Sequence, residues 1–171
     1  LTGLINAGAT GGTDRALASK ATSTGNFANI SYAIVIRNVG SLPVKLSRIR
    51  YAGELWRSGS LAGMEEKITT FYAISDAPLT SIASGPTNAI AAPGAGFAAM
   101  PAGANTLISS TTAATGLDGN LPLNRSNVDF IPLAAEMPAI LPGQYFTFKW
   151  TDPNEATGSD GHQAIDDVTL N

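Results

Sequence analysis

The sequence predicts an all-β protein, a two-sheet antiparallel β-sandwich of the jelly-roll type. Apolar and polar side chains alternate, as at Ile30, Tyr32, Ile34 and Ile36, and a period of two is typical of a half-buried strand. Helical periodicity is weak, and residues 64–67 favour only a turn or a short helix. Because a single sheet would leave its apolar face in water, two sheets are expected to pack together.

Glycine, proline, asparagine and serine residues separate the segments that read as strands. In the clearest C-terminal segment, Phe146, Phe148 and Trp150 share one parity, so Trp150 is expected in the core. Gly53 and Glu54 are expected to form a turn before Trp56. The expected strands are 28–39, 44–51, 67–75, 128–133, 144–150 and 164–170.

The length of 171 residues fits one domain with one core. Residues 1–12 are expected to form a flexible N-terminal arm, and residues 13–171 the sandwich. In the arm, Leu1, Leu4 and Ile5 precede a glycine-containing run. These residues could serve as a donor strand that adds to the sheet edge of an adjacent subunit, or the arm could simply be disordered.

A long region at about 77–117, between Asp76 and Asp118, contains no charged residue. Its prolines and glycines disfavour a long regular strand, so we expect extended loops. Two interpretations are open: its apolar residues pack onto the sandwich, or they form an uncharged surface that docks against a neighbour. The apolar residues concerned are Ile90, Phe97, Met100, Leu107 and Ile108.

Composition excludes several classes of partner. Charged residues make up 13% of the chain and the net charge is -3, which leaves no basic stripe for nucleic acid. No run of about 18 apolar residues is present, so we expect no membrane-spanning segment. The absence of cysteine leaves the compartment open. The chain begins at Leu1 without a signal-peptide pattern, which is compatible with a processed, secreted protein or with an expressed fragment.

Carboxylates are concentrated near the C-terminus. Five of the 13 acidic residues lie between Asp152 and Asp167, and no Lys or Arg follows Lys149. Such a cluster is stable if its members stay solvated, accept backbone N–H groups or share a cation. An acid-rich turn and a Ca²⁺ site therefore both remain open. The candidate Ca²⁺ ligands are Asp152, Asn154, Asp160 and Asp166, with Asp14 and Asp167 as second choices.

The side chains that catalysis requires are scarce. There is no cysteine nucleophile, His162 is the single histidine, and the pattern Gly-x-Ser-x-Gly is absent. We therefore expect no enzymatic activity. His162 is expected to lie in a loop and to bond the neighbouring acidic turn.

Four sequence blocks occur in a characteristic order. They are Thr13–Leu17, Tyr51–Arg57, Leu117–Asn120 with Asn124–Arg125, and Trp150–Asp152 continuing through Gly158–Asp167. Together they resemble a secreted bacterial module found in surface proteins with PEP-CTERM sorting signals and beside extracellular nuclease or lamin-tail domains. The resemblance implies an extracellular β-sandwich without a settled activity. The chain departs from the pattern in its uncharged insertion before Leu117 and in Gln163.

Two non-catalytic functions remain open. The first is an extracellular structural or adhesive protein of the cell surface that assembles with copies of itself, by strand addition, into a filament or matrix. The second is a Ca²⁺-stabilised carbohydrate-binding module that binds a surface glycan through Trp56 and Arg57. Trp56 could equally plug the core. A lesser alternative is an accessory domain of a secreted hydrolase.

Overall fold

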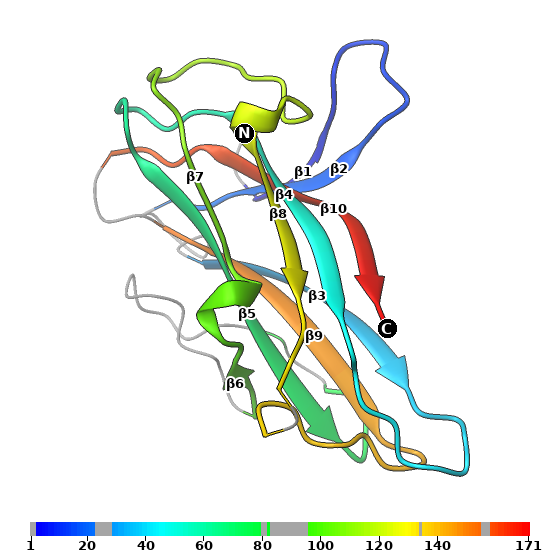
Figure 1. Cartoon of the computed structure of the whole chain (residues 1–171). Coiled ribbons are helices and arrows are strands. Elements are labelled where there is room, and N and C mark those ends of the chain that lie inside the picture. The colour runs from blue at the N-terminus through cyan, green and yellow to red at the C-terminus, as the bar shows by residue number, and fades with distance from the viewer. Residues whose placement is uncertain (1–2, 23–28, 80–81, 83–95, 134, 155–157) are drawn as a thin grey trace.

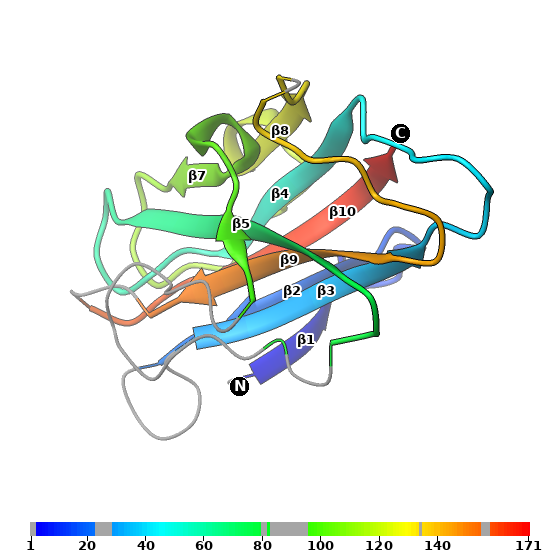
Figure 2. The ribbon, with the colours of Figure 1, turned by 90° about the horizontal axis from the view of Figure 1, so that it is seen from below.

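The computed structural model describes residues 3–22, 29–79, 82, 96–133, 135–154 and 158–171, and it is a sandwich of two antiparallel sheets (Figures 1 and 2). Sheet A has the strand order β1-β2-β10-β4-β8, and sheet B has the order β3-β9-β5-β6, with β7 also paired to β5. This confirms the predicted all-β sandwich. The elements are β1 (Gly3–Ala7), β2 (Ala16–Lys20), β3 (Asn29–Arg37), β4 (Ile49–Arg57), β5 (Glu65–Ser75), β6 (Ala98–Ala99), η2 (Ala102–Ala104), β7 (Thr106–Ser109), η3 (Pro122–Asn124), β8 (Arg125–Phe130), β9 (Tyr145–Pro153) and β10 (His162–Leu170).

The connectivity is that of a jelly roll. The first half of the chain pairs with the second half in reverse order: β2 with β10, β3 with β9, β4 with β8, and β5 with both β6 and β7. This arrangement places consecutive strands β2 to β5 alternately in sheets A and B, as two nested Greek keys require. Within the described residues, no helix has the length and apolarity needed to cross a membrane.

Strand β9 supplies the centre of the core. Phe146, Phe148 and Trp150 lie between the sheets and are at most 2% exposed, which confirms the core position predicted for Trp150. The rings of Phe148 and Trp150 meet edge to face with their centroids 4.7 Å apart, and Tyr51 of sheet A meets Trp150 at 5.7 Å. Burial of these rings is the main force that joins the two sheets.

Strand β4 begins later and runs further than the sequence predicted. The expected turn at Gly53 and Glu54 is wrong, because both residues lie in the middle of β4. A Cβ atom at Gly53 would lie 2.6 Å from Cγ2 of Thr106, so the glycine allows β7 to approach β4 closely. The turn or short helix expected at 64–67 is wrong as well. There β5 starts at Glu65, which lies opposite Ser109 of β7.

Residues 3–7 form an edge strand of sheet A, which differs from the flexible arm expected over residues 1–12. Leu4 lies opposite Ser19 and Ile5 opposite Ala18, and Ile5 packs against a buried cluster of alanines. Pairing with β2 satisfies backbone groups on one side of the segment, which favours order. Leu1 lies outside the described residues.

The uncharged region at about 77–117 is not loop throughout, since it contains β6, η2 and β7. Phe97, Met100 and Ile108 are buried, whereas Leu107 is 51% exposed. Packing onto the sandwich is therefore the interpretation that fits these residues. Ile90 lies outside the described part of the chain.

A buried lysine lies beneath this region on the outer face of sheet B. Lys149 is 0% exposed. Its Nζ atom lies 4.8 Å from the centre of the Phe71 ring and 4.3 Å from that of Phe97. Burial lowers the pKa of Lys149 to about 8.

Replacing Lys149 by methionine is expected to stabilise the protein at neutral pH. Because its pKa of about 8 lies below the ordinary 10.5, the folded state binds fewer protons than the unfolded state between these values, and stability rises with pH across that window. The shift corresponds to about 3 kcal/mol of stability that the unmodified protein lacks at neutral pH and regains across this window. Urea unfolding from about pH 7 to about pH 10.5 should show the gain shrinking as pH rises. A gain independent of pH would mean that packing, not charge, is responsible.

Candidate functional site

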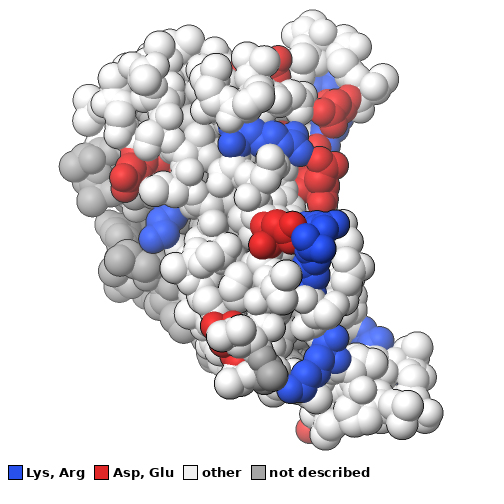
Figure 3. Space-filling model, viewed as in Figure 1, with Lys and Arg blue, Asp and Glu red and all other residues white. Residues whose placement is uncertain are grey.

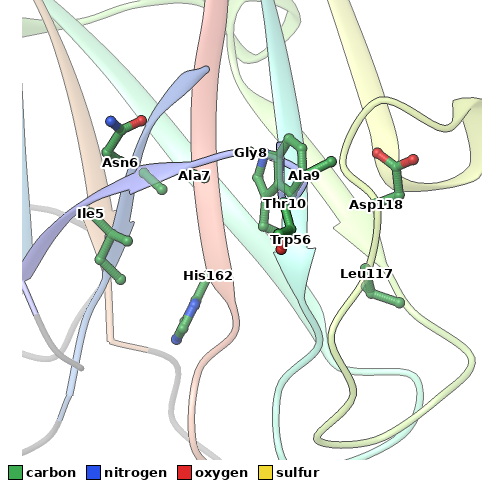
Figure 4. Close-up of a pocket in the computed structure, with 11 residues that line it drawn as sticks. Ile5, Asn6, Ala7, Gly8, Ala9, Thr10, Trp56, Leu117, Asp118 and His162 are labelled. Atoms are coloured by element: carbon green, nitrogen blue, oxygen red, sulfur yellow. The ribbon is translucent and has the colours of Figure 1, made fainter. Parts of the chain in front are cut away.

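A pocket of about 360 Å³ lies on the outer face of sheet A, next to the turn that joins β1 and β2 (Figure 4). Figure 4 shows Trp56 of β4 between His162 of β10 on one side and the Leu117–Asp118 loop on the other, with residues 8–10 close by. The side chains that give the pocket its chemistry are Thr10, Ala18, Trp56, Asp118 and His162. Asn6 is at the rim, and its side chain shares a face with Leu17, opposite to that of Ile5 and Ala18.

One row of residues across sheet A forms the base of this region. In the strand register the row passes from β1 to β8, and directly opposed residues place their side chains on the same face. The central positions of the row are the alanines Ala18 and Ala164, which are both 0% exposed. Their side chains are single methyl groups, which leave room above the sheet. The row consists of Ile5, Ala18, Ala164, Glu54 and Arg125.

A buried carboxylate holds Trp56 in place. Glu54 has a fully buried side chain and accepts hydrogen bonds from Nε1 of Trp56 at 3.0 Å and from Nη1 of Arg125 at 2.5 Å. Arg125 also donates from Nη2 to Asp167 at 2.5 Å. Burial raises the pKa of the Glu54 carboxyl, while Trp56 and Arg125 oppose this shift. The network therefore orients the indole at some electrostatic cost.

The loop that starts at Leu117 packs against the indole. The backbone N–H of Leu117 donates to the Trp56 carbonyl at 2.9 Å. A Cβ atom on Gly119 would lie 2.6 Å from the indole ring, so only glycine allows the loop backbone to contact the ring this closely. Asp118 Oδ1 accepts the backbone N–H of Asn120 at 3.1 Å, which fixes the orientation of the Asp118 carboxylate.

His162 is the first residue of β10 and lines the pocket, which differs from the loop position expected from the sequence. Burial lowers its pKa to about 4, with smaller contributions from Lys20 and Arg57. The imidazole is therefore neutral at physiological pH. A neutral imidazole offers one N–H donor and one acceptor.

The two residues predicted to bind a ligand occupy different positions. Trp56 is half-buried, lines the pocket and packs against a buried cluster of alanines, and ligand binding by this residue stays a prediction. Arg57 follows it on the opposite parity of β4 and pairs with the backbone of Gly116. Arg57 is not among the residues that line the pocket.

The six predicted Ca²⁺ ligands fall into two groups. Asp152, Asn154 and Asp160 are at most 8% exposed and flank the β9–β10 connection. Asp152 Oδ1 accepts a hydrogen bond from Nε2 of Gln163 at 3.1 Å. Among the described residues, no group of three or more His, Cys, Asp or Glu is arranged to hold a metal ion. Ca²⁺ binding stays a prediction for this first group.

The second group lies on the exterior of sheet A. Asp14 is exposed and Asp166 is half-buried, while the side chain of Asp167 is 71% exposed and pairs with Arg125. These carboxylates therefore do not join the buried group at the β9–β10 connection. The counter-charge for Asp167 comes from β8, which could not be anticipated from the cation-free C-terminal sequence.

Sequence reasoning missed Thr10 and Asp118 as members of a site. A signal was present for Asp118, because it belongs to one of the four sequence blocks, which are far apart in sequence yet converge on sheet A. Thr10 lies outside all four blocks. One block contributes Ala16 to the buried cluster of alanines. The other three contribute Trp56, Asp118 and His162 to the pocket above this cluster. Their convergence on one face is what the order of the blocks could have suggested.

Fold and pocket together define a jelly-roll sandwich with a ligand-sized pocket on the outer face of one sheet. Comparison of the chain with protein-family models, with curated proteins and with solved structures gave no match. The chemistry of the pocket is therefore the basis for assigning a function.

Proposed function

We propose that this chain is a non-catalytic extracellular adhesive module that binds a carbohydrate in the pocket over Trp56. The observation that carries the proposal is the composition of the pocket: an indole and small apolar residues beside a carboxylate, a hydroxyl and a neutral imidazole. A sugar presents C–H groups on one side and hydroxyl groups around its rim. Aromatic rings pack against the former, and Asp, Thr and neutral His hydrogen-bond the latter.

The charge distribution supports a neutral ligand. In Figure 3 some of the Lys and Arg side chains lie beside Asp or Glu side chains, and much of this face is uncharged. Arg48 and Arg50, for example, both contact Asp129. Cations that are already paired are poorly suited to bind a nucleic-acid backbone, so a polyanionic partner is disfavoured.

The buried acid next to the pocket supports a binding role over a catalytic one. The side chain of Glu54 is 0% exposed, and both of its oxygens are occupied by Trp56 and Arg125. A general acid or base has to reach the atom that it protonates, and a carboxylate sealed beneath the indole cannot. The network instead serves to position Trp56.

Trp56→Ala is expected to abolish or strongly weaken sugar binding. A glycan array identifies the ligand for the unmodified protein, and isothermal titration then measures its Kd. Loss of the indole face should weaken binding at least about tenfold, corresponding to about 1.4 kcal/mol. Tyr145→Ala is the matched control, because it removes a half-buried ring from sheet B that contacts Arg37. This variant should bind like the unmodified protein.

Trp56→Ala could also disturb the fold, since Trp56 donates to Glu54. Thr10→Val removes only a hydroxyl from the pocket wall, and it should lower affinity while leaving the thermal transition unchanged. Binding should be constant between about pH 5 and pH 8, because His162 stays neutral there. No bound glycan, or equal affinity in all three variants, would contradict the proposal.

A Ca²⁺-stabilised version of the same module is the second candidate. It is favoured by the burial of Asp152, Asn154 and Asp160 at the β9–β10 connection, because buried carboxylates are stabilised by a cation. The titrations with sugar are therefore repeated in EDTA and in CaCl₂. Lower affinity and a lower thermal transition in EDTA would support Ca²⁺, and identical curves would contradict it.

A further inference from the structure

Sheet A ends in an open edge at β1. Strand β1 pairs with β2 on one side only, and no strand in the described part of the chain lies along its other side (Figure 2). The outward-facing N–H and C=O groups of Gly3–Ala7 are therefore available to another strand. Such an edge is a template for pairing unless charge, proline or a bulge protects it.

The two edge strands of sheet A, β1 and β8, differ in whether they carry charged residues that discourage pairing. Strand β8, at the opposite edge of sheet A, carries Arg125 and Asp129. Strand β1 has no charged residue and no proline, and its Leu4 side chain is 58% exposed. Charge on an edge strand discourages pairing, whereas an uncharged strand with an exposed leucine favours it.

A groove runs beside this edge. It has a volume of about 360 Å³ and is lined by Leu4, Ile5, Asn6, Arg15, Ala16 and Leu17. Leu17 is 46% exposed, so leucines of both β1 and β2 are open to solvent at the rim of sheet A. Apolar side chains from a neighbouring strand would bury this surface.

We propose that two copies of this chain associate through antiparallel pairing of β1 with β1, which makes sheet A continuous across the two copies. A strand that adds here has to be uncharged, of similar length and free along one edge, and a second β1 meets all three conditions. With the two-fold axis at Ile5, Leu4 of each copy lies opposite Asn6 of the other. An interface of this kind is self-complementary and closes as a dimer, and a net charge of only -3 per chain gives weak repulsion.

Sedimentation equilibrium over a wide range of protein concentration tests the proposal. The unmodified chain should show a reversible monomer–dimer equilibrium, and Leu4→Lys should weaken dimerisation at least about tenfold by placing like charges at the paired edges. Leu42→Lys is the matched control, because Leu42 is 72% exposed and lies in the β3–β4 connection. It makes the same charge change and should leave the equilibrium unchanged.

Cysteine cross-linking identifies the surface. The chain contains no cysteine, so Ile5→Cys introduces a single thiol at the two-fold axis, where opposed strand residues are close enough for a disulfide. Oxidation should give a covalent dimer with Ile5→Cys but not with Val35→Cys on the exposed edge strand β3, where Val35 is 47% exposed. A monomer at all concentrations, a dimer unaffected by Leu4→Lys, or cross-linking only at Val35 would overturn the proposal.

The interface and the sugar pocket are adjacent, because Ile5 lines both the pocket and the edge groove. Leu4 does not line the pocket over Trp56, so Leu4→Lys should remain able to bind the same glycan as a monomer. Failure of dimerisation with intact sugar binding would overturn only the interface, and failure of sugar binding with an intact dimer would overturn only the adhesive function.

Discussion

Phe148→Ala is expected to lower the free energy of unfolding by about 3–5 kcal/mol, which is the range for a buried phenylalanine removed from a packed core. Phe148 is 0% exposed and lies against Trp150, Phe146 and Tyr51. Its loss leaves a cavity where the two sheets meet. Urea unfolding followed by tryptophan fluorescence measures the change.

The control for this substitution is Val39→Ala, because Val39 is 87% exposed and should contribute little. If Phe148→Ala does not fold, Phe148→Leu gives a graded version with a smaller cavity. A change at Phe148 no larger than at Val39 would contradict the assignment of β9 as the centre of the core.

Glu54→Ala is expected to have the second large effect, a loss of about 3 kcal/mol in the free energy of unfolding. The substitution leaves Arg125, whose side chain is only 19% exposed, and Nε1 of Trp56 without their shared acceptor. Because burial raises the pKa of Glu54, the intact pair adds little net stability. The penalty comes from the partners that remain after the carboxylate is removed.

Glu54→Gln separates shape from charge. The single amide oxygen can accept a hydrogen bond from Trp56 or from Arg125, but the NH2 group then faces the other donor. This variant should therefore lose less stability than Glu54→Ala while remaining less stable than the unmodified protein. Asp129→Ala is the matched control for losing an arginine partner, since Asp129 pairs with Arg48 and Arg50 at the surface, and exposed pairs contribute little. Equal melting temperatures for Glu54→Ala and Asp129→Ala would show that the buried network does not support the fold.

Glu54→Ala should also weaken sugar binding, because Trp56 loses the hydrogen bond that orients its ring. Titration with the glycan at a temperature where the variant remains folded distinguishes this effect from unfolding. A variant with lower stability but unchanged affinity would mean that the packing of Gly119 alone positions the indole.

Local alternation was sufficient to predict the sandwich and the inward face of β9. The side chains of Phe146, Phe148 and Trp150 were assigned correctly because a strand places alternate residues on one face, whatever lies across from it. Strands β1, β2, β6 and β7 were not predicted. All four are short, and β1, β2 and β6 contain mainly small residues or a single apolar pair, so their strand character depends on pairing with neighbours and not on a long apolar period. Strand β7 alternates buried and exposed residues, but over only four positions.

The candidate site depended on contacts that no local pattern contains. Arg125 reaches Glu54 across 71 residues and Asp167 across 42 residues of sequence, and these contacts exist only because the jelly-roll order places β8 next to β4 and β4 next to β10. The amino-acid sequence by itself determined which residues face the core, since side-chain direction follows from the backbone of each strand. Only the tertiary structure decided which polar residues meet, because the register between strands distant in sequence is set by the packing of the whole sandwich.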